Sequence, residues 1–296
     1  MPEIVYLNGS LVARSQARVS AFDHGFLYGY GLFETMRAYH GKILRLDRHL
    51  QRLMDSSAIL GMAGGLADID LGRACTDTLA ANKLTDARLR LTVSRGEVPS
   101  FPGVNNHTIP TVLVTATPYS PPSLAVYARG YTAGITSLRR QSQSVLSEIK
   151  STNYLLSILA KIESERAGLD EALLLNEQGF IAEGSISNLF FVRGELLLTP
   201  PVVSGILPGV TRGVVMELAH ALAIGNYEVD INQIDIQSFD EAFLTNSVLE
   251  IMPLVRIRNA DGETLTVGSG QPGRVTRRLM DAYGELVERE TSGKNG

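Results

Sequence analysis

The stretch "SEIKSTNYLLSILAKIE", residues 147–163, joins an extended segment to an amphipathic helix and carries Lys150 at the join. Its flanks are mostly uncharged, which fits a half-buried position. A lysine amine with an ordinary pKa of about 10.4 is a poor nucleophile at neutral pH, but burial lowers that pKa. The local pattern therefore leaves two interpretations, a solvated surface lysine or an amine that attacks a carbonyl to form a Schiff base.

The composition around this stretch is that of an ordinary globular protein. Of the 296 residues, 44% are hydrophobic and 20% charged, and the chain is long enough for two domains. A net charge of −4 without a basic cluster argues against binding to nucleic acid or to a membrane surface. The N-terminus lacks a signal-peptide pattern, and no apolar run approaches the roughly 20 residues that span a bilayer. We expect a soluble, cytoplasmic protein.

The sequence offers little for a metal ion to bind. The single cysteine, Cys75, cannot form an internal disulfide or a cysteine-based zinc site, and the five histidines show no ligand spacing. Signatures of α/β-hydrolases, P-loop proteins and zinc proteases are absent from the sequence. We therefore expect no bound metal.

Strands come in runs with helices between them, which predicts an α+β protein with two sheet-bearing domains. Asn8-Gly9, His40-Gly41 and the turn at residues 177–179 predict hairpins. Helical spacing of apolar residues predicts helices from Leu46 and over residues 151–167. Three prolines at 118, 121 and 122 predict a linker over residues 118–124. We expect a smaller N-terminal domain over residues 1–117 and a larger one over residues 125–296.

Three further stretches place polar residues where a ligand could bind. In "FIAEGSISNLF", Glu183 follows an apolar strand and could bond a protonated ring nitrogen, or could simply face water. In "SGILPGVTRGVVMELA", Val210 and Thr211 begin a helix, which suits a phosphate but also an ordinary N-cap. In "FLTNSVLEIMP", residues 245–247 interrupt an apolar strand as a second phosphate turn or as a plain turn.

A fourth stretch, "RLRLTVSR", places Arg88 and Arg90 on one face of a strand, together with Thr92 and Ser94. Two arginines on one face could clamp a carboxylate in bidentate fashion. A solvated outer face of a sheet explains the same pattern.

In this order and at these spacings, the motifs resemble those of the class IV pyridoxal-phosphate enzymes. That group contains branched-chain aminotransferases, D-amino-acid transaminases, R-selective amine transaminases and 4-amino-4-deoxychorismate lyases. The resemblance runs from "YLNG" to the C-terminal helix and is most specific in "HLQRL", "IKSTNYL", "EGSISN", "ILPGVTR" and "TNSVLEIMP". It implies the two-domain α+β fold of class IV aminotransferases, pyridoxal 5′-phosphate in the interdomain cleft, and a homodimer.

The resemblance also implies roles for individual residues. Lys150 looks like the lysine that forms the internal aldimine and moves the proton during catalysis. Arg52 occupies the position of the phosphate-binding arginine, and Glu183 that of the glutamate that pairs with the pyridine nitrogen. The other residues expected to contact the cofactor are Tyr154, Asn188, Leu207 (under the ring), Val210, Thr211, Asn246 and Ser247. Those expected to contact the substrate are Tyr28, Phe33, Arg37, Arg88 and Arg90.

The sequence departs from the best-known members of the group at the substrate positions. Branched-chain aminotransferases typically carry Tyr-x-Arg-Pro where this chain has Arg88, Arg90 and Leu91, and the arginine and histidine of D-amino-acid transaminases are missing after "SRG". The first hypothesis is a transaminase for a small or branched apolar amino acid, or an amine, with a 2-oxo acid acceptor. The second is an aminodeoxychorismate lyase, which the turn "TNSVLEIMP" resembles more closely. The third is a non-catalytic relative that binds a cofactor or a metabolite.

Overall fold

The computed structural model describes residues 3–97 and 109–292 and divides into two compact units. Unit 1 comprises the described residues within 1–120, 149–153 and 287–296, and unit 2 comprises residues 121–148 and 154–286. Each unit contains one sheet with helices packed against it, which confirms the α+β prediction. Over the described ranges, we find no helix with the length and hydropathy needed to cross a membrane.

Unit 1 is built on a six-stranded sheet in the order β2-β1-β6-β5-β3-β4, in which every neighbouring pair is antiparallel. Its strands are β1 (Ile4–Leu7), β2 (Ser10–Ala13), β3 (Gly31–Tyr39), β4 (Lys42–Ile43), β5 (Ala87–Ser94) and β6 (Thr111–Pro118). Its helices are α1 (His24–Tyr28), α2 (Leu46–Ile59), α3 (Ala63–Leu66) and α4 (Leu71–Ala81).

The two tight hairpins of unit 1 follow from their turn residues. Asn8 and Gly9 both have positive φ, 46° and 92°, and so do His40 and Gly41, at 51° and 80°. Two consecutive residues with positive φ give the type I′ turn, whose twist matches that of the paired strands. Both predicted hairpins are confirmed, β1–β2 and β3–β4.

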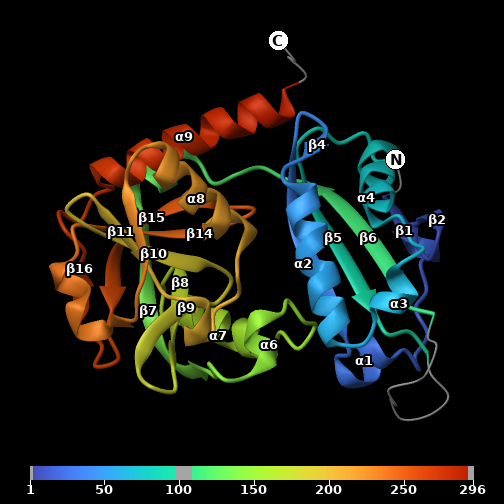
Figure 1. Cartoon of the computed structure of the whole chain (residues 1–296), viewed down its shortest axis with the longest axis horizontal. Helices are drawn as coiled ribbons and strands as arrows, with labels where there is room; N and C mark the ends of the chain where they lie inside the picture. Colours follow the sequence, from blue (N-terminus) through green and yellow to red (C-terminus); the bar gives the residue numbers. More distant parts are fainter. Residues whose placement is uncertain (1–2, 98–108, 293–296) are drawn as a thin grey trace. The chain divides into compact units, whose positions relative to one another are not determined.

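One face of this sheet is apolar and covered by helices. Alternate residues of β5, such as Leu89 and Leu91, join Leu32 and Met36 of β3 in a fully buried cluster. Leu53 of α2 and Leu79 of α4 pack into the same cluster, so α2 and α4 lie along this face (Figure 1). The opposite face of β3 and β5 carries four of the five residues for which we predicted substrate contacts, namely Phe33, Arg37, Arg88 and Arg90.

The segment Ile149–Asn153 lies with unit 1, whereas the sequence interpretation placed it in the second domain and began a helix at residue 151. The amide of Phe33 donates to the carbonyl of Lys150, and Thr152 donates its amide to Gly31, each at 2.9 Å. Because this backbone is hydrogen-bonded to β3, the helix α7 (Leu155–Arg166) begins only at Leu155. The predicted start of the helix was therefore wrong by four residues.

The last turn of the C-terminal helix α9 (Arg274–Thr291) also groups with unit 1. Arg45 forms an ion pair with Glu290 at 2.9 Å, and His40 lies 3.2 Å from the hydroxyl of Thr291. These contacts explain why residues 287–292 group with the first unit rather than the second.

Unit 2 contains a ten-stranded sheet in the order β12-β11-β10-β14-β15-β7-β8-β9-β13, with β16 added to β15. Its strands are β7 (Tyr131–Arg140), β8 (Glu171–Asn176), β9 (Phe180–Gly184), β10 (Asn188–Arg193), β11 (Leu196–Thr199), β12 (Gly225–Glu228), β13 (Ile231–Asn232), β14 (Glu241–Asn246), β15 (Glu250–Arg258) and β16 (Thr264–Thr266). Its helices are α5 (Leu124–Arg129), α6 (Val145–Glu148), α7, α8 (Val210–Ala221) and most of α9.

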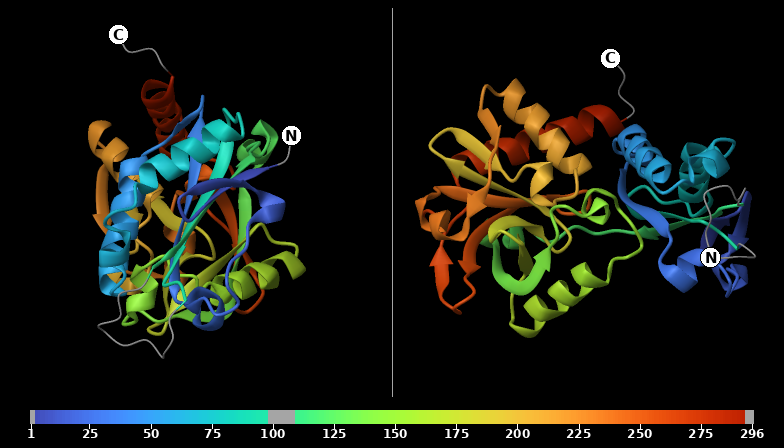
Figure 2. Two further views of the ribbon diagram at one scale, coloured as in Figure 1. Left: turned by 90° about the vertical axis from the view of Figure 1, so that its right-hand side faces the viewer. Right: turned by 60° about the horizontal axis from the view of Figure 1, so that its bottom comes forward.

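The strands of unit 2 curve around one large apolar cluster to which β7, β8, β10, β14 and β15 all contribute (Figure 1, Figure 2). Strand β7 runs parallel to both β8 and β15, and a parallel pair needs a crossover connection. Helix α7 provides the connection from β7 to β8 and packs on the outer side through Ala160, against Ala172 and Leu174. This arrangement leads the chain into the β8–β9 hairpin that carries Glu183.

Candidate functional site

Lys150 is held on strand β3 by its own backbone, and its side chain is half-buried. Its Nζ lies 4.5 Å from the centre of the Phe33 ring, and the guanidinium of Arg90 lies 3.8 Å from the same ring. The hydroxyl of Thr152 donates to the carbonyl of Gly29 at 2.6 Å, and the Asn153 amide does so at 3.0 Å. Unit 1 therefore fixes the position of Lys150 next to two of the predicted substrate residues.

Arg52 lies on α2 in a buried ion pair that the sequence interpretation did not anticipate. Its Nε donates to Oε1 of Glu34 at 2.8 Å and its Nη2 to Oε2 at 2.5 Å. His49, one turn earlier on α2, lies with Nδ1 2.7 Å from the same Oε2. The side chain of Glu34 is 1% exposed, that of His49 is 2% and that of Arg52 is 12%.

The charges within this cluster follow from burial and from close partners. Burial alone would raise the pKa of Glu34, but the charge of Arg52 and hydrogen bonds from His49 and Arg52 outweigh it and lower the pKa to about 2. Burial lowers the pKa of His49, against the opposing effect of Glu34, and the charges of Arg52 and Lys150 lower it further. At neutral pH, Glu34 is therefore an anion and His49 is neutral. Because a carboxylate only accepts, Nδ1 of His49 carries the proton.

The open face of the unit 1 sheet is rich in arginine. The strand register places Arg37 directly opposite Arg88, and Arg90 opposite Thr35. Like charges directly opposite each other destabilise a sheet unless something compensates for them. Arg37 is buried, with its guanidinium 4.3 Å from the ring centre of Tyr39 and 4.8 Å from that of Tyr119, whereas Arg88 is exposed.

Tyr28 lies apart from these arginines, on the short helix α1, and is half exposed, at 53%. Its ring meets that of His24 edge to face, with ring centres 5.1 Å apart. The buried carboxylate of Asp23 fixes this helix because it accepts from the amide of Gly25 and from the hydroxyls of Ser94 and Thr111. The remaining predicted substrate residue, Phe33, is the buried ring between Lys150 and Arg90.

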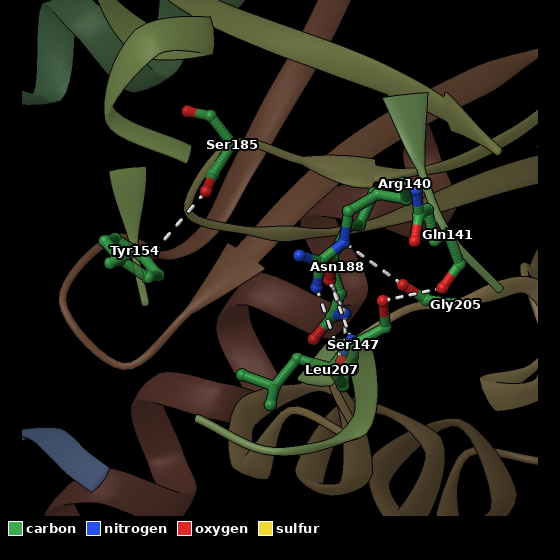
Figure 3. A network of polar contacts seen from close by, with 9 residues as sticks. Arg140, Gln141, Ser147, Tyr154, Ser185, Asn188, Gly205 and Leu207 are labelled. Atoms are coloured by element: carbon green, nitrogen blue, oxygen red, sulfur yellow. Dashed lines mark hydrogen bonds and ion pairs between the residues drawn. The ribbon is translucent and has the colours of Figure 1, made fainter. Parts of the chain in front are cut away.

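Glu183 is the centre of a second buried network, in unit 2. Its Oε1 lies 2.5 Å from Nη2 of Arg140, and its Oε2 accepts from the side-chain amide of Asn188 and from the backbone amide of Leu207. Arg140 is fixed in turn by the carbonyls of Gly205 and Ser147, as Figure 3 shows. Three donors hold this carboxylate in place, so the alternative that Glu183 faces water is wrong.

Tyr154 lies near this network and remains protonated at neutral pH. Burial, followed by the negative charge of Glu183, raises the pKa of its phenol to about 12. Its hydroxyl donates a long hydrogen bond of 3.5 Å to the carbonyl of Ser185 (Figure 3). Tyr154 can therefore donate a hydrogen bond but cannot act as a base near neutral pH.

The start of α8 and the β14–β15 turn approach the same part of unit 2. Gly209 is the N-cap of α8 and makes no side-chain cap, and a Cβ at this position would collide with the side-chain oxygen of Asn188. Asn188 also pairs with Thr245 in the β10–β14 register. The side-chain amide of Asn246 donates at 3.2 Å to Ile186, in the loop that follows Glu183.

These features fit a phosphate group. The amides of the first turn of a helix lack intrahelical acceptors, and Val210 and Thr211 stand in the first turn of α8. The hydroxyl of Thr245 is buried and finds no hydrogen-bond partner among the residues that the structure describes. Ser247, in the adjacent turn, is partly buried and supplies a further hydroxyl. An anion at the start of α8 would meet the amides of this first turn, which lack intrahelical acceptors.

Of the predicted residues, the structure brings Lys150, Phe33 and Arg90 together in unit 1, and it brings Glu183, Asn188 and Leu207 together in unit 2. Sequence reasoning missed Glu34, His49 and Arg140. A glutamate within the apolar run "GLFETM" and an Arg-Arg doublet at the end of a strand were the available signals. Within residues 3–97 and 109–292, no group of three or more His, Cys, Asp or Glu side chains could hold a metal ion.

The chain matches the family "Amino-transferase class IV" over residues 31–257. It is 39% identical to a Methanocaldococcus jannaschii protein provisionally named a branched-chain-amino-acid aminotransferase, over 95% of this chain and 96% of that one. It is 34% identical to the aminodeoxychorismate lyase of Bacillus subtilis, over 99% of this chain and 98% of that one. The crystal structure of the Escherichia coli branched-chain amino acid aminotransferase superposes with a TM-score of 0.87 at 31% identity, covering 100% of this chain and 98% of the other.

Proposed function

Because the chain belongs to the class IV aminotransferases, we propose that it moves an amino group between a small or branched apolar amino acid, or an amine, and a 2-oxo acid. Enzymes of this family depend on pyridoxal 5′-phosphate, and Lys150 is the residue that would carry it here. The observation that supports this best is the anchored, half-buried Lys150 amine beside the buried Phe33 ring. A lysine that only faced solvent would not require its backbone to be hydrogen-bonded to strand β3.

The other residues would divide the work of holding the cofactor. Arg52, the start of α8 with Thr211, and the turn of Asn246 and Ser247 are suited to the phosphate. Glu183, an acceptor fixed by three donors, is suited to pair with the protonated ring nitrogen. When bound, the cofactor supplies an electron sink for the bond that breaks at the substrate's α-carbon. Lys150 then moves the proton at that carbon.

The arginine-rich face of β3 and β5 would bind the substrate carboxylate. Arg37 and Arg88 face each other across the strands, and Arg90 lies against Phe33 next to Lys150. A bound carboxylate would offset the repulsion between like charges, and guanidinium groups bind carboxylates in bidentate fashion. Phe33 and Tyr28 would contact the apolar part of the substrate.

A second candidate is an aminodeoxychorismate lyase, which releases pyruvate and 4-aminobenzoate. The similarity to the Bacillus subtilis lyase over nearly the full length of both chains supports it. The turn of residues 245–247, which carries Asn246 and Ser247 rather than a Gly-Thr pair, also favours it. Release of pyruvate from aminodeoxychorismate, with no transamination of any amino donor, would select this candidate.

We also propose that the protein is a homodimer. Exposed apolar side chains cluster on and before α1, at Phe22, Phe26 and Leu27. A second row follows α7 at helical spacing, at Leu155, Ile158, Leu159 and Ile162. Light scattering should give a mass twice the 32.1 kDa of one chain, whereas the mass of a single chain would contradict the proposal.

The first experiment is an absorption spectrum of the purified protein with cofactor, before and after each of four donors: L-leucine, L-glutamate, D-alanine and an R-configured amine. Loss of the visible band with one donor supports a transaminase and identifies the enantiomer. Lys150→Ala should lose both the band and turnover while keeping its fold by circular dichroism. Unchanged turnover in Lys150→Ala would refute the assignment.

A further inference from the structure

Glu34 is a charged residue in the apolar interior of unit 1. It lies on the face of β3 that packs against α2, between Leu32 and Met36, and both of these belong to the buried core. A charge in such a place costs several kcal/mol unless it is paired and hydrogen-bonded. Glu34 is fully paired, and both partners, His49 and Arg52, come from a single turn of α2.

The main effect of the Glu34–Arg52 pair is geometric, because it fixes the orientation of the Arg52 guanidinium. Two parallel bonds, from Nε to Oε1 and from Nη2 to Oε2, hold the guanidinium in one plane. The bond from His49 to Oε2 fixes the carboxylate in turn. An arginine has five N–H donors in a rigid fork, so fixing one edge sets the direction of the others. The three side chains together carry no net charge when His49 is neutral.

We propose that Glu34, held by His49, is a positioning residue that orients the Arg52 guanidinium for the phosphate group of the cofactor. The inference rests on the proposed function, in which Arg52 binds that phosphate. A purely structural ion pair would stabilise unit 1 without distinguishing a phosphorylated ligand from an unphosphorylated one. A positioning role makes that distinction, because in the proposed function Arg52 would contact the cofactor through its phosphate.

The test compares two ligands that differ only in the phosphate. The apoprotein is titrated with pyridoxal 5′-phosphate and with pyridoxal, for wild type and for Glu34→Gln, and the visible absorbance of each complex is followed. We expect Glu34→Gln to weaken binding of the phosphorylated ligand about 10- to 100-fold, the range for a lost hydrogen bond to a charged group, and to weaken pyridoxal binding less than about twofold. Equal weakening of both ligands, or of neither, would overturn the inference.

The control is a buried carboxylate with no arginine to orient. Glu241 accepts from the backbone amides of Val275 and Thr276 at the start of α9, at 2.9 and 2.7 Å. Glu241→Gln should lower the stability of the protein and leave the ratio of the two affinities unchanged. A changed ratio in this variant would show that the ratio reports stability rather than position, and would also overturn the inference.

Two further variants keep the test decisive if Glu34→Gln folds poorly. His49→Gln leaves the Glu34–Arg52 pair intact and should shift the affinity ratio in the same direction by only a few-fold. Arg52→Lys cannot form the two parallel bonds to Glu34. Adding Glu34→Gln to this variant should therefore leave the ratio of the two affinities unchanged, and an additive change in the ratio would contradict the proposal. If wild type shows no band that depends on Lys150, the proposed function fails. If wild type shows the band and the ratios do not move, only the positioning role fails.

Discussion

Each unit contains a buried glutamate paired with an arginine, but the two pairs are built in opposite ways. In unit 1, Arg52 grips Glu34 with two parallel bonds, and the glutamate has one further partner, His49. In unit 2, Arg140 pairs with Oε1 of Glu183, and Oε2 accepts from two uncharged donors, Asn188 and Leu207. The carboxylate of unit 1 therefore depends almost wholly on its arginine, whereas that of unit 2 does not.

This difference matches the roles that we propose for the two pairs. Where the arginine is the ligand-binding group, the acid orients it and lies deepest in the core, with 1% of its side chain exposed. Where the acid is the ligand-binding group, the arginine orients it from the side and the acid is 9% exposed. The same two residue types thus serve as support or as binding group, and the glutamate that we propose to bind a ligand is the more exposed of the two glutamates.

The largest expected effect comes from removing each arginine. Arg52→Ala leaves Glu34 as a buried carboxylate with only His49, and we expect it to lower the free energy of unfolding by about 3–5 kcal/mol. Arg140→Ala leaves two donors on Glu183 and should cost about 1–3 kcal/mol. Urea unfolding of the apoproteins measures both, because bound cofactor would shift the stability of each variant differently.

The control for this pair of variants is Arg73→Ala on α4. Arg73 pairs with Asp77 on the exposed helix surface, at 3.3 Å, and its loss should cost about 0.5 kcal/mol or less. Equal costs for Arg52→Ala and Arg140→Ala would contradict the comparison, since the number of remaining donors would then not matter.

The second effect separates turnover from cofactor affinity. Glu183→Gln keeps an acceptor for the Leu207 amide but loses the negative charge that would hold the ring nitrogen protonated. We expect kcat at saturating cofactor to fall about 10²- to 10³-fold, the usual effect of removing one preorganised electrostatic partner. Glu34→Gln should recover most of its kcat once cofactor saturates. Near-normal turnover in Glu183→Gln would mean that the ring nitrogen has another partner.

Much of the fold was predictable because it depends on neighbouring residues. Asn8-Gly9 and His40-Gly41 specify their hairpins through backbone conformations that few other residue pairs adopt, and both were predicted. The segment after Lys150 was not, because "STNYLLSILAKIE" has helical spacing from its first residue. Hydrogen bonds to Gly29, Gly31 and Phe33, more than a hundred residues away in the chain, keep its start extended.

The same distinction applies to the candidate site. Lys150, Glu183 and Thr211 stand in short motifs whose order and spacing could be read from the sequence. Glu34, His49 and Arg140 act through partners that are distant in the sequence, as Arg140 does with Glu183, so a local pattern can mark such a residue but cannot identify its partner. A charged residue within an apolar strand, such as Glu34, is the signal that a sequence reading should have followed.

The third effect is a dependence of stability on pH in unit 1. The pKa of His49 is lowered by burial, so the unfolded chain takes up a proton below the ordinary pKa of 6.5 before the folded protein does. Stability should therefore fall with decreasing pH, by up to about 1.4 kcal/mol per pH unit from this group. Glu34, whose pKa is lowered from 4.5 to about 2, adds a second loss only below pH 4.5. The loss from His49 thus begins at a higher pH than the loss from Glu34.

Urea unfolding at pH 6.5, 5.5 and 4.5 tests the loss from His49. The difference in unfolding free energy between wild type and His49→Gln should shrink as the pH falls, because the variant lacks the proton that the unfolded wild type gains. A constant difference for His49→Gln would show that the folded protein takes up the proton on His49 at the same pH as the unfolded chain does, and would contradict the prediction.

The smallest effect concerns Tyr154 beside Glu183. Its hydrogen bond to Ser185 is long, at 3.5 Å, so Tyr154→Phe should cost about 0.5–1.5 kcal/mol at pH 7. Because the pKa of Tyr154 is raised to about 12, the folded protein keeps the phenol proton above pH 10 while the unfolded chain loses it. The contribution of Tyr154 should then decline as the pH rises from 10 toward 12, and wild type and Tyr154→Phe should converge in urea unfolding at pH 10.5. If the difference in unfolding free energy between wild type and Tyr154→Phe grew with pH, the phenol would ionise easily in the folded state. Arg140 would then compensate the charge of Glu183 more fully than the ion pair between them suggests.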